Sequence, residues 1–204
     1  MPHSRKDKQR QTKERLLQSA QDMIAAGGMS AASIRGICDG AGFSQGAFYS
    51  NFASKDDLLM ELLEAQIAEE VGFLGALIDQ TTAYDATLAA LSERFATLAM
   101  QPEWSLLAIE LQLHAQRDAA FAQRYNESKA RTHAAFAHLL ETLIERHNLV
   151  AKLPALQIAI GLHALWSGLV IEGTAEDALP RSEIHLAFFK ALIRPATAKP
   201  DPTD

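Results

Sequence analysis

Apolar residues recur along most of this chain at the three- and four-residue spacing of amphipathic helices. The spacing first occurs between residues 12 and 26, where Leu16, Ala20 and Ile24 mark one face and a Gly-Gly pair ends the helix. No stretch of any length alternates apolar and polar positions as a half-buried strand would. The pattern therefore predicts an all-α protein.

Between Ser33 and Leu59 the apolar stripes are shorter, and turn and capping residues separate them. One apolar stripe ends at Gly42, where a residue that tolerates the left-handed conformation allows a sharp turn. Ser44 is placed to cap a very short second helix, and Ser54 to cap a third. Helix, glycine turn and short helix together predict a helix-turn-helix, whose second helix enters the major groove of DNA.

The short second helix divides into outward polar positions and inward rings. Gln45, Gly46 and Ala47 stand at its N-terminal end, where a recognition helix presents side chains to base edges. Glycine costs a helix roughly 1 kcal/mol against alanine, so Gly46 is explained if the backbone must approach another surface closely. Phe48 and Phe52 are spaced i and i+4, and we expect both rings to turn into the core.

Polar side chains around these helices carry groups that can bind phosphate oxygens: Ser33, Tyr49, Asn51 and Lys55. Ser33 is also expected to cap the helix that it precedes, and capping is the simpler role. Lys55 lies in the first turn of a helix, where its charge opposes the helix dipole. A lysine there is explained if the ammonium and the helix N-terminus bind one phosphate together. A solvated surface lysine is the alternative.

The charge of the chain is unevenly distributed. The formal net charge is −6, yet the first 55 residues contain eight basic and four acidic residues and therefore carry +4. The remainder carries −10. This asymmetry suits a protein that meets the phosphate backbone at one end and stays soluble at the other. A charge run by itself is more often a solvated surface.

The length of the chain and the positions where its helices are expected to begin and end predict one small helix-turn-helix unit and one larger helical unit. Residues 1–11 are expected to form a flexible basic arm, and residues 12–54 the helix-turn-helix domain. Residues 55–194 are expected to form the larger helical domain, and residues 195–204, with three prolines, a disordered tail. Within the larger domain, apolar periodicity predicts helices over about 55–78, 85–98, 103–114, 118–147, 155–173 and 180–194.

Two features of the larger domain bear on its role. The helix from Trp104 to His114 is apolar around most of its circumference, so it is expected to be interior and able to line a cavity. The last two helices carry small residues, among them Gly161 and Gly168, and more apolar surface than one chain needs. We therefore expect them to pack against a second copy around a twofold axis, which would make a homodimer.

The cysteine content and the apolar segments of the chain indicate in which cellular compartment it is expected. Cys38 is the single cysteine, so no intrachain disulfide forms, and its place on an apolar stripe favours a small buried hydrophobe over a redox sensor. No apolar segment is expected to approach the roughly 20 residues that span a bilayer. The basic N-terminus lacks the apolar core of a signal peptide. A cytoplasmic protein without a membrane partner is expected.

The helix-turn-helix closely resembles that of the TetR family of bacterial transcriptional regulators. The resemblance rests on SIRGI at 33–37, AGFSQGAFY at 41–49, and Phe52, Lys55 and Leu58. It implies a three-helix DNA-binding domain followed by a larger helical domain for ligand binding and dimerisation. It also implies a homodimer that reads a palindromic double-stranded DNA operator and is released by a small-molecule effector.

The family motif also implies roles for individual residues. Major-groove contacts fall to Ser44, Gln45, Gly46 and Ala47. Phosphate contacts fall to Ser33, Tyr49 and Lys55, while Asn51 is a weaker match because the family varies there. Cys38 and Gly40 depart from the family, which often has alanine and a better helix former at these positions.

Ring-bearing side chains on the predicted inner helices are the candidates for an effector pocket: Phe95, Trp104, His114, Phe136 and Trp166. Ordinary core packing is the competing explanation for these rings.

An enzyme or a metal protein is the competing functional class. Glu110 and His114 are spaced i and i+4, and His133, His138 and His163 offer further imidazoles. No HExxH or CxxC pattern accompanies them, so core or surface histidines are favoured, and no metal or other cofactor is expected. The other alternative is a DNA-binding protein that a protein partner controls without a small ligand. The favoured interpretation is a transcriptional repressor without catalytic activity.

Overall fold

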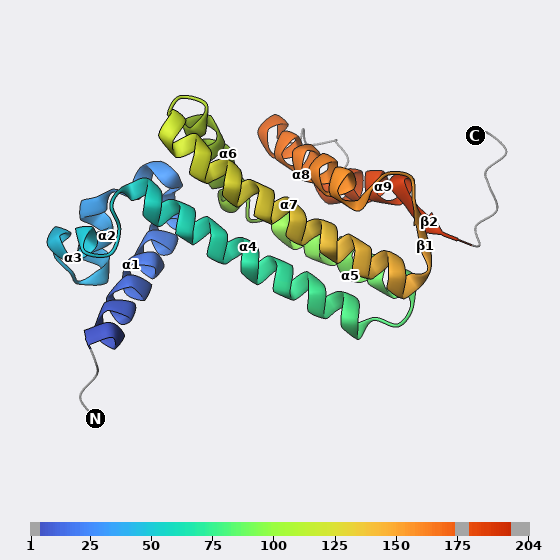
Figure 1. Cartoon of the computed structure of the whole chain (residues 1–204), viewed down its shortest axis with the longest axis horizontal. Helices are drawn as coiled ribbons and strands as arrows, with labels where there is room; N and C mark the ends of the chain where they lie inside the picture. Colours follow the sequence, from blue (N-terminus) through green and yellow to red (C-terminus); the bar gives the residue numbers. More distant parts are fainter. Residues whose placement is uncertain (1–4, 174–179, 197–204) are drawn as a thin grey trace. The chain divides into compact units, whose positions relative to one another are not determined.

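The computed structural model describes residues 5–173 and 180–196, and this part of the chain is almost entirely helical (Figure 1). The predicted all-α class is confirmed. The chain divides into two compact units: the first unit comprises residues 1–66 and 106–125, and the second unit comprises residues 67–105 and 126–204. Three helices contribute residues to both units, so this division differs from the predicted one at residue 55.

The helices follow the order that the sequence predicts. The first unit begins with α1 (Arg5–Gly27), the 3-10 turn η1 (Met29–Ala31), α2 (Ile34–Ala41), α3 (Gln45–Tyr49) and the start of α4 (Lys55–Gln80). The remaining helices are α5 (Tyr84–Ala99), α6 (Glu103–Ala115), α7 (Ala119–His147), α8 (Ala155–Glu172) and α9 (Arg181–Leu192).

Helix α1 begins earlier than predicted. It starts at Arg5, so most of the segment expected to be a flexible arm is helical, and residues 1–4 lie outside the described part. Apolar periodicity could not reveal this extension because its residues are polar. Its Lys, Arg and Gln residues favour helix. Arg10 also pairs with Glu14 one turn on, at 3.5 Å.

The apolar faces of the first helices meet in the core of the first unit. Leu16 of α1, Ile37 of α2 and Phe48 of α3 are fully buried. Phe52 is 4% exposed, and its ring centroid lies 5.5 Å from that of Phe48. Gly42 has a φ of 74° and ends α2 in the left-handed conformation. The predicted turn and the inward aromatic rings are therefore confirmed.

The second unit is built around a cluster of buried apolar side chains: Ile78, Leu88, Leu143, Leu149, Ile158, Leu162, Leu186, Phe189 and Ile193. One buried hydroxyl beside this cluster joins two helices and the loop that follows α4. Thr87 Oγ1 of α5 lies 2.6 Å from Thr81 Oγ1, just beyond α4, and 3.0 Å from His147 Nε2 at the end of α7. These hydrogen bonds satisfy a polar group that the fold has enclosed.

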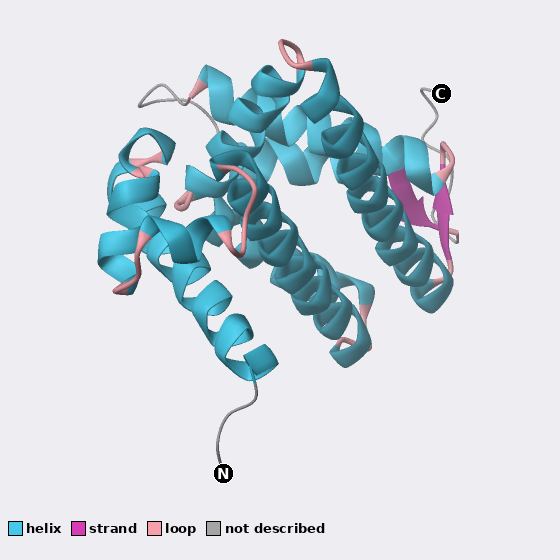
Figure 2. Ribbon diagram, turned by 60° about the vertical axis from the view of Figure 1, so that its left-hand side comes forward, coloured by secondary structure: helices cyan, strands magenta, loops and turns pink. Residues whose placement is uncertain are grey.

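Two short strands were not predicted. Figure 2 shows β1 (Leu149–Ala151) beside β2 (Ile193–Pro195), and the pair is antiparallel with Val150 opposite Arg194. Strands this short leave no alternating pattern to read. They shorten the predicted last helix and place Pro195 in a strand instead of a disordered tail. Residues 197–204 of that tail lie outside the described part.

Helix α6 is less enclosed than predicted. Leu107 and Leu111 are buried, whereas Leu106 and Leu113 are 44% and 49% exposed. The expectation of a helix buried on all sides is therefore wrong for this chain on its own. An apolar circumference shows which faces can be buried, and the neighbouring helices decide which face is covered.

Candidate functional site

The first turn of α3 is exposed, whereas Phe48 in the same helix is buried. Ser44 caps the helix, because its Oγ accepts a hydrogen bond from the Ala47 amide at 3.3 Å. Gln45 and Gly46 are exposed, and Ala47 is half-buried. Phe48 is fully buried and fastens the helix to the core. The helix can thus present its N-terminal turn to a partner.

Gly46 is small without an intramolecular reason. The nearest neighbour of a Cβ built on Gly46 would be Ser44 Oγ at 3.6 Å, an ordinary van der Waals distance. The φ of Gly46 is not in the left-handed region. Alanine would fit here in the free protein, so no contact in the described structure requires glycine at this position.

The side chains predicted to bind phosphate have different environments. Ser33 Oγ accepts a hydrogen bond from the Gly36 amide at 3.0 Å, which confirms its capping role, and the residue remains exposed. Tyr49 is 57% exposed. Lys55 is half-buried, and its Nζ donates a hydrogen bond to the Met29 carbonyl at 3.4 Å. Because an ammonium has three donors, this contact leaves others for a phosphate.

The side chain of Asn51 bonds to the backbone of its own helix. Its Nδ2 donates a hydrogen bond to the Ala47 carbonyl at 2.8 Å, and its Oδ1 is buried without a hydrogen-bond partner. The amide therefore bonds back onto α3 with one of its two N–H donors. The phosphate contact of Asn51 stays a prediction, and spacing along the sequence could not show which way the amide turns.

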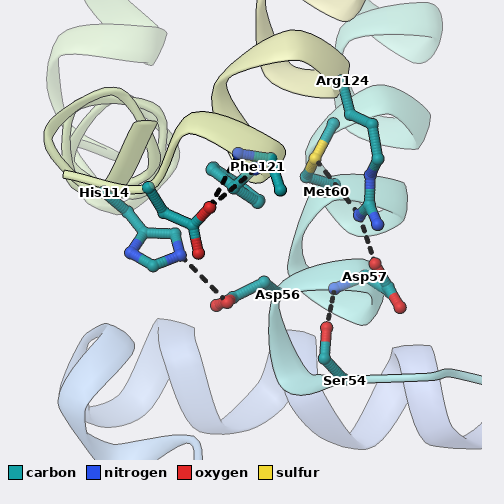
Figure 3. A network of polar contacts seen from close by, with 9 residues as sticks. Ser54, Asp56, Asp57, Met60, His114, Phe121 and Arg124 are labelled. Carbon is teal, nitrogen blue, oxygen red and sulfur yellow. Dashed lines mark hydrogen bonds and ion pairs between the residues drawn. The ribbon is translucent and has the colours of Figure 1, made fainter. Parts of the chain in front are cut away.

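A network of ion pairs ties the first turn of α4 to the corner between α6 and α7 (Figure 3). Asp57 pairs with Arg124 of α7, and Asp56 Oδ2 lies 3.2 Å from His114 Nε2 at the end of α6. Ser54 Oγ accepts a hydrogen bond from the Asp57 amide at 3.1 Å and so caps α4, as predicted. The network places the α6–α7 corner with the helix-turn-helix in the first unit.

The start of α7 is held within the same corner. Asp118 Oδ1 accepts a hydrogen bond from the Phe121 amide at 3.0 Å. This bond is the main reason that the pKa of Asp118 lies below its usual value, and nearby His114 adds to the effect. Tyr125 Oη donates to the Ala108 carbonyl at 3.0 Å, and burial raises the pKa of Tyr125 to about 12. The corner is therefore a fixed part of the first unit.

We expect Arg124→Gln to lower the free energy of unfolding by roughly 0.5–1.5 kcal/mol, because it leaves the carboxylate of Asp57 without its charged partner. The Asp57 side chain is 19% exposed and the Arg124 side chain 53%. Arg117→Gln removes the same charge from an exposed position between α6 and α7 and serves as the control. Urea unfolding compares the two variants, and equal stability would contradict a structural role for the pair.

The rings predicted to line a pocket are divided between the two units. Phe95 and Trp166 lie 6.2 Å apart in the second unit. His114 belongs instead to the first unit, in the ion-pair network. Within the described residues, Trp104 and Phe136 are half-buried and form no ring-to-ring contact with either of these two. Sequence periodicity places a ring on a helix but does not show which helices face each other.

Phe95 and Trp166 form an aromatic cluster with His185 of α9, which the sequence analysis missed. The His185 ring lies edge to face against Phe95 at 4.8 Å and against Trp166 at 5.4 Å. Trp166 Nε1 donates a hydrogen bond to Ser105 Oγ at 3.0 Å. His185 is 6% exposed, and burial, followed by the nearby His163, lowers its pKa to about 4. A histidine within an apolar helix was the one signal available.

A pair of histidines stands one turn from Trp166 on α8. His133 Nε2 of α7 lies 2.8 Å from His163 Nδ1 of α8, so one ring donates a hydrogen bond and the other accepts it. Burial is the main cause that lowers the pKa of His163 to about 4. Burial and the charge of Lys129 also lower the pKa of His133. Both rings are therefore neutral at neutral pH.

Two of the histidines considered as metal ligands, His133 and His163, form the pair just described. In the described part of the chain, no group of three or more His, Cys, Asp or Glu side chains is arranged to hold a metal ion. Glu110 is exposed, while His114 is engaged with Asp56. His138 Nδ1 lies 3.8 Å from Glu141 on an exposed part of α7. These histidines form local contacts instead of a coordination shell.

Helices α8 and α9 leave large apolar side chains exposed. Leu156, Ile160 and Ile171 of α8 are 48%, 43% and 66% exposed, and Phe188 of α9 is 53% exposed. By length and composition α8 could cross a membrane, and it is the one such helix in the described residues. The expectation that no segment approaches this length is therefore wrong. The opposite side of α8 supplies Ile158 to the core of the second unit, which is typical of a helix in a packed protein.

Comparison with known sequences finds matches to two parts of the chain. Residues 16–62 match the tetR family of bacterial regulatory proteins, and residues 83–194 match the C-terminal domain of BetI-type transcriptional repressors. The second match covers more than half of the chain. Over 48 residues the chain is 46% identical to the HTH-type transcriptional repressor KstR2 of Mycobacterium tuberculosis. That alignment covers 24% of this chain and 24% of the repressor, so the chain spans about a quarter of this relative's length.

Solved structures share the fold over nearly the whole chain. A TetR-family transcriptional regulator from Mesorhizobium loti has a TM-score of 0.68 at 17% identity, and the alignment covers 94% of this chain and 100% of that chain. A transcriptional regulator from Saccharomonospora viridis, solved in complex with choline, has a TM-score of 0.66 at 19% identity, with 91% and 99% covered. At these identities the likeness establishes the fold alone.

Proposed function

Because this chain belongs to the TetR family of bacterial regulatory proteins, we propose that it binds a palindromic DNA operator as a homodimer and represses transcription until a small-molecule effector releases it. The family consists of DNA-binding transcriptional regulators and is not a family of enzymes. The observation that carries the proposal is the exposed first turn of α3, where Gly46 is kept small although alanine would fit. Such a turn suits direct reading of bases in the major groove. This function would be carried out in the cytoplasm.

The side chains around α3 divide into two kinds of contact. Contacts to base edges are assigned to the first turn: Ser44, Gln45, Gly46 and Ala47. Contacts to phosphates are assigned to side chains that flank it: Ser33, Tyr49 and Lys55. Phosphate contacts fix the register of the protein on the duplex, whereas contacts to base edges select the sequence.

The exposed apolar face of α8 and α9 supports the homodimer. Two recognition helices must lie about one DNA turn apart, roughly 34 Å, to enter successive major grooves. A twofold pairing through these helices would cover Ile160 and Phe188 and match the symmetry of a palindromic site. It would also remove the exposed apolar side chains from water without a membrane.

The aromatic cluster of Phe95, Trp166 and His185 supports an effector site in the second unit. An effector can release DNA only if it binds one arrangement of the two reading heads more tightly than the other. The Saccharomonospora viridis regulator, solved in complex with choline, is an example of this fold with a small molecule bound.

Gln45→Ala and Lys55→Gln should have different effects on DNA binding. We expect the first to weaken operator binding by about 1 kcal/mol or more and to reduce the preference for operator over scrambled DNA, because a base contact is lost. The second should weaken both DNAs alike and lower the slope of log K against log salt by about 1, because a phosphate contact is lost. Gln can still donate to the Met29 carbonyl, which Lys55 contacts in the free protein.

Titration of operator and scrambled DNA at several salt concentrations measures both effects. Glu64→Gln is the control. Glu64 is on the same helix as Lys55 but is not among the residues assigned to DNA contacts, so this variant changes a charge without removing a proposed contact. Equal losses for the Gln45 and Lys55 variants on both DNAs would contradict the division into base and phosphate contacts.

A further inference from the structure

Two enclosed nitrogen atoms on α9 have no hydrogen-bond partner in the described structure. They are Nη1 of Arg181 and Nδ1 of His185. The two residues are one helical turn apart, at positions i and i+4, and so lie on the same face of the helix. A buried polar group without a partner costs roughly 1–3 kcal/mol, and a charged group costs more. A bound ligand that accepts hydrogen bonds from these nitrogen atoms would remove this cost, so the two atoms mark a candidate ligand site.

Apolar rings border this face of α9. The ring of His185 lies against Phe95 of α5 and Trp166 of α8. Aromatic side chains offer a large area for the apolar part of a ligand, while a small number of polar groups fix its orientation. Here the available polar groups are a guanidinium and an imidazole. The combination suits a molecule with one polar end and an apolar body.

The charges around the cluster favour a negative polar end. Arg181 carries a permanent positive charge. Lys129 lies close enough for its charge to contribute to the lowered pKa of His163. The carboxylates of Glu93 on α5 and Glu183 on α9 are exposed. A cationic ligand would meet like charge at this face, whereas an anion would meet donors.

We propose that this face of the second unit binds a small organic anion, with its carboxylate or phosphate oxygens held by Arg181 and His185 and its apolar body against Phe95 and Trp166. The inference rests on the proposed function, because the bound anion would be the effector that releases DNA. A guanidinium N–H and an imidazole N–H both donate to anion oxygens, and charge-assisted hydrogen bonds are roughly twice as strong as neutral ones. The two unpartnered nitrogen atoms would then both be satisfied.

An anion at this place also changes the protonation of His185. In the free protein burial lowers its pKa to about 4, so the ring is neutral at neutral pH. A bound anion favours the charged imidazole and therefore raises that pKa. Affinity should then increase as the pH falls from about 8 to about 6, because the complex takes up a proton that the free protein does not hold. A carboxylate ligand stays ionised over this range.

The site is tested by calorimetry on the full chain without DNA, with probes that separate charge from shape. Phenylacetate carries a ring and a carboxylate, phenylacetamide keeps the ring without the charge, and acetate keeps the charge without the ring. We expect phenylacetate to bind at least about ten-fold more tightly than either. Phenyl phosphate distinguishes a phosphate from a carboxylate, and choline tests a cation of the kind seen in the Saccharomonospora viridis regulator.

Variants of α9 connect the affinity to the proposed contacts. Arg181→Gln should weaken phenylacetate binding by about ten-fold or more and change phenylacetamide binding little. Lys190→Gln removes an exposed charge from the same helix and should leave both unchanged. His185→Asn should remove the increase in affinity at low pH. Circular dichroism of each variant verifies that the helices are retained.

The possible outcomes are distinct. Equal binding of phenylacetate and phenylacetamide, equal effects of Arg181→Gln and Lys190→Gln, or no binding of any probe up to about 10 mM would overturn the anion site. Choline binding that becomes tighter in Arg181→Gln would show a cation site instead. Operator release is measured separately with labelled DNA. Binding of phenylacetate without release would retain the anion site and contradict its role as an effector site.

Discussion

Replacing Ile160 and Phe188 together by glutamate should make the protein monomeric and weaken operator binding by roughly 100-fold or more. In a single chain these side chains are 43% and 53% exposed, so the new carboxylates meet water and the fold should be retained. In the proposed dimer the same carboxylates would be buried without a counter-charge, at a cost that a helix interface does not recover. A monomer keeps one recognition helix but loses the gain in affinity from linking two half-sites.

Sedimentation equilibrium and operator titration measure the two effects on the same samples. Met100→Glu is the control, because Met100 is 83% exposed and follows α5, outside α8 and α9. It introduces the same charge at an exposed apolar side chain and should change neither assembly nor DNA binding. A double variant that remains dimeric, or a monomer that binds operator as the wild type does, would contradict pairing through α8 and α9.

The helix-turn-helix could be predicted because its signals are local. Ser33 and Ser44 cap their helices through amides three residues ahead, and Gly42 ends α2 at a φ of 74°. Each of these contacts lies within the reach of one helical turn, so residue type and spacing are enough to find it. The start of α1 was not predicted, because its residues are polar and show no apolar periodicity.

The remaining contacts join distant parts of the chain. Asp57 and Arg124 are 67 positions apart, and neither residue differs in sequence from an ordinary surface charge. Phe95 and Trp166 were chosen as rings on predicted inner helices, yet their partner His185 comes from a third helix. Only the packing of α5, α8 and α9 shows which rings meet. Periodicity alone therefore identified parts of the cluster and missed the residue at its centre.

Gly46→Ala should weaken operator binding by roughly 5- to 150-fold, the factor that corresponds to the 1–3 kcal/mol cost of overpacking a close interface. The free protein should be at least as stable as the wild type, because alanine favours helix by up to about 1 kcal/mol. The structure leaves room for the methyl group, whose nearest neighbour would be Ser44 Oγ at 3.6 Å. Stability and DNA affinity are thus expected to change in opposite directions.

A variant that is more stable but binds operator more weakly has lost a DNA contact, because a folding defect would lower both quantities. Gly72→Ala is the matched control, since Gly72 is exposed in the middle of α4 and a Cβ there would meet nothing within 4 Å. It should raise stability by a similar amount and leave operator binding unchanged. Thermal unfolding without DNA and titration with operator measure both quantities for each variant. If Gly46→Ala binds operator as tightly as Gly72→Ala does, the backbone of α3 at Gly46 does not approach the DNA closely.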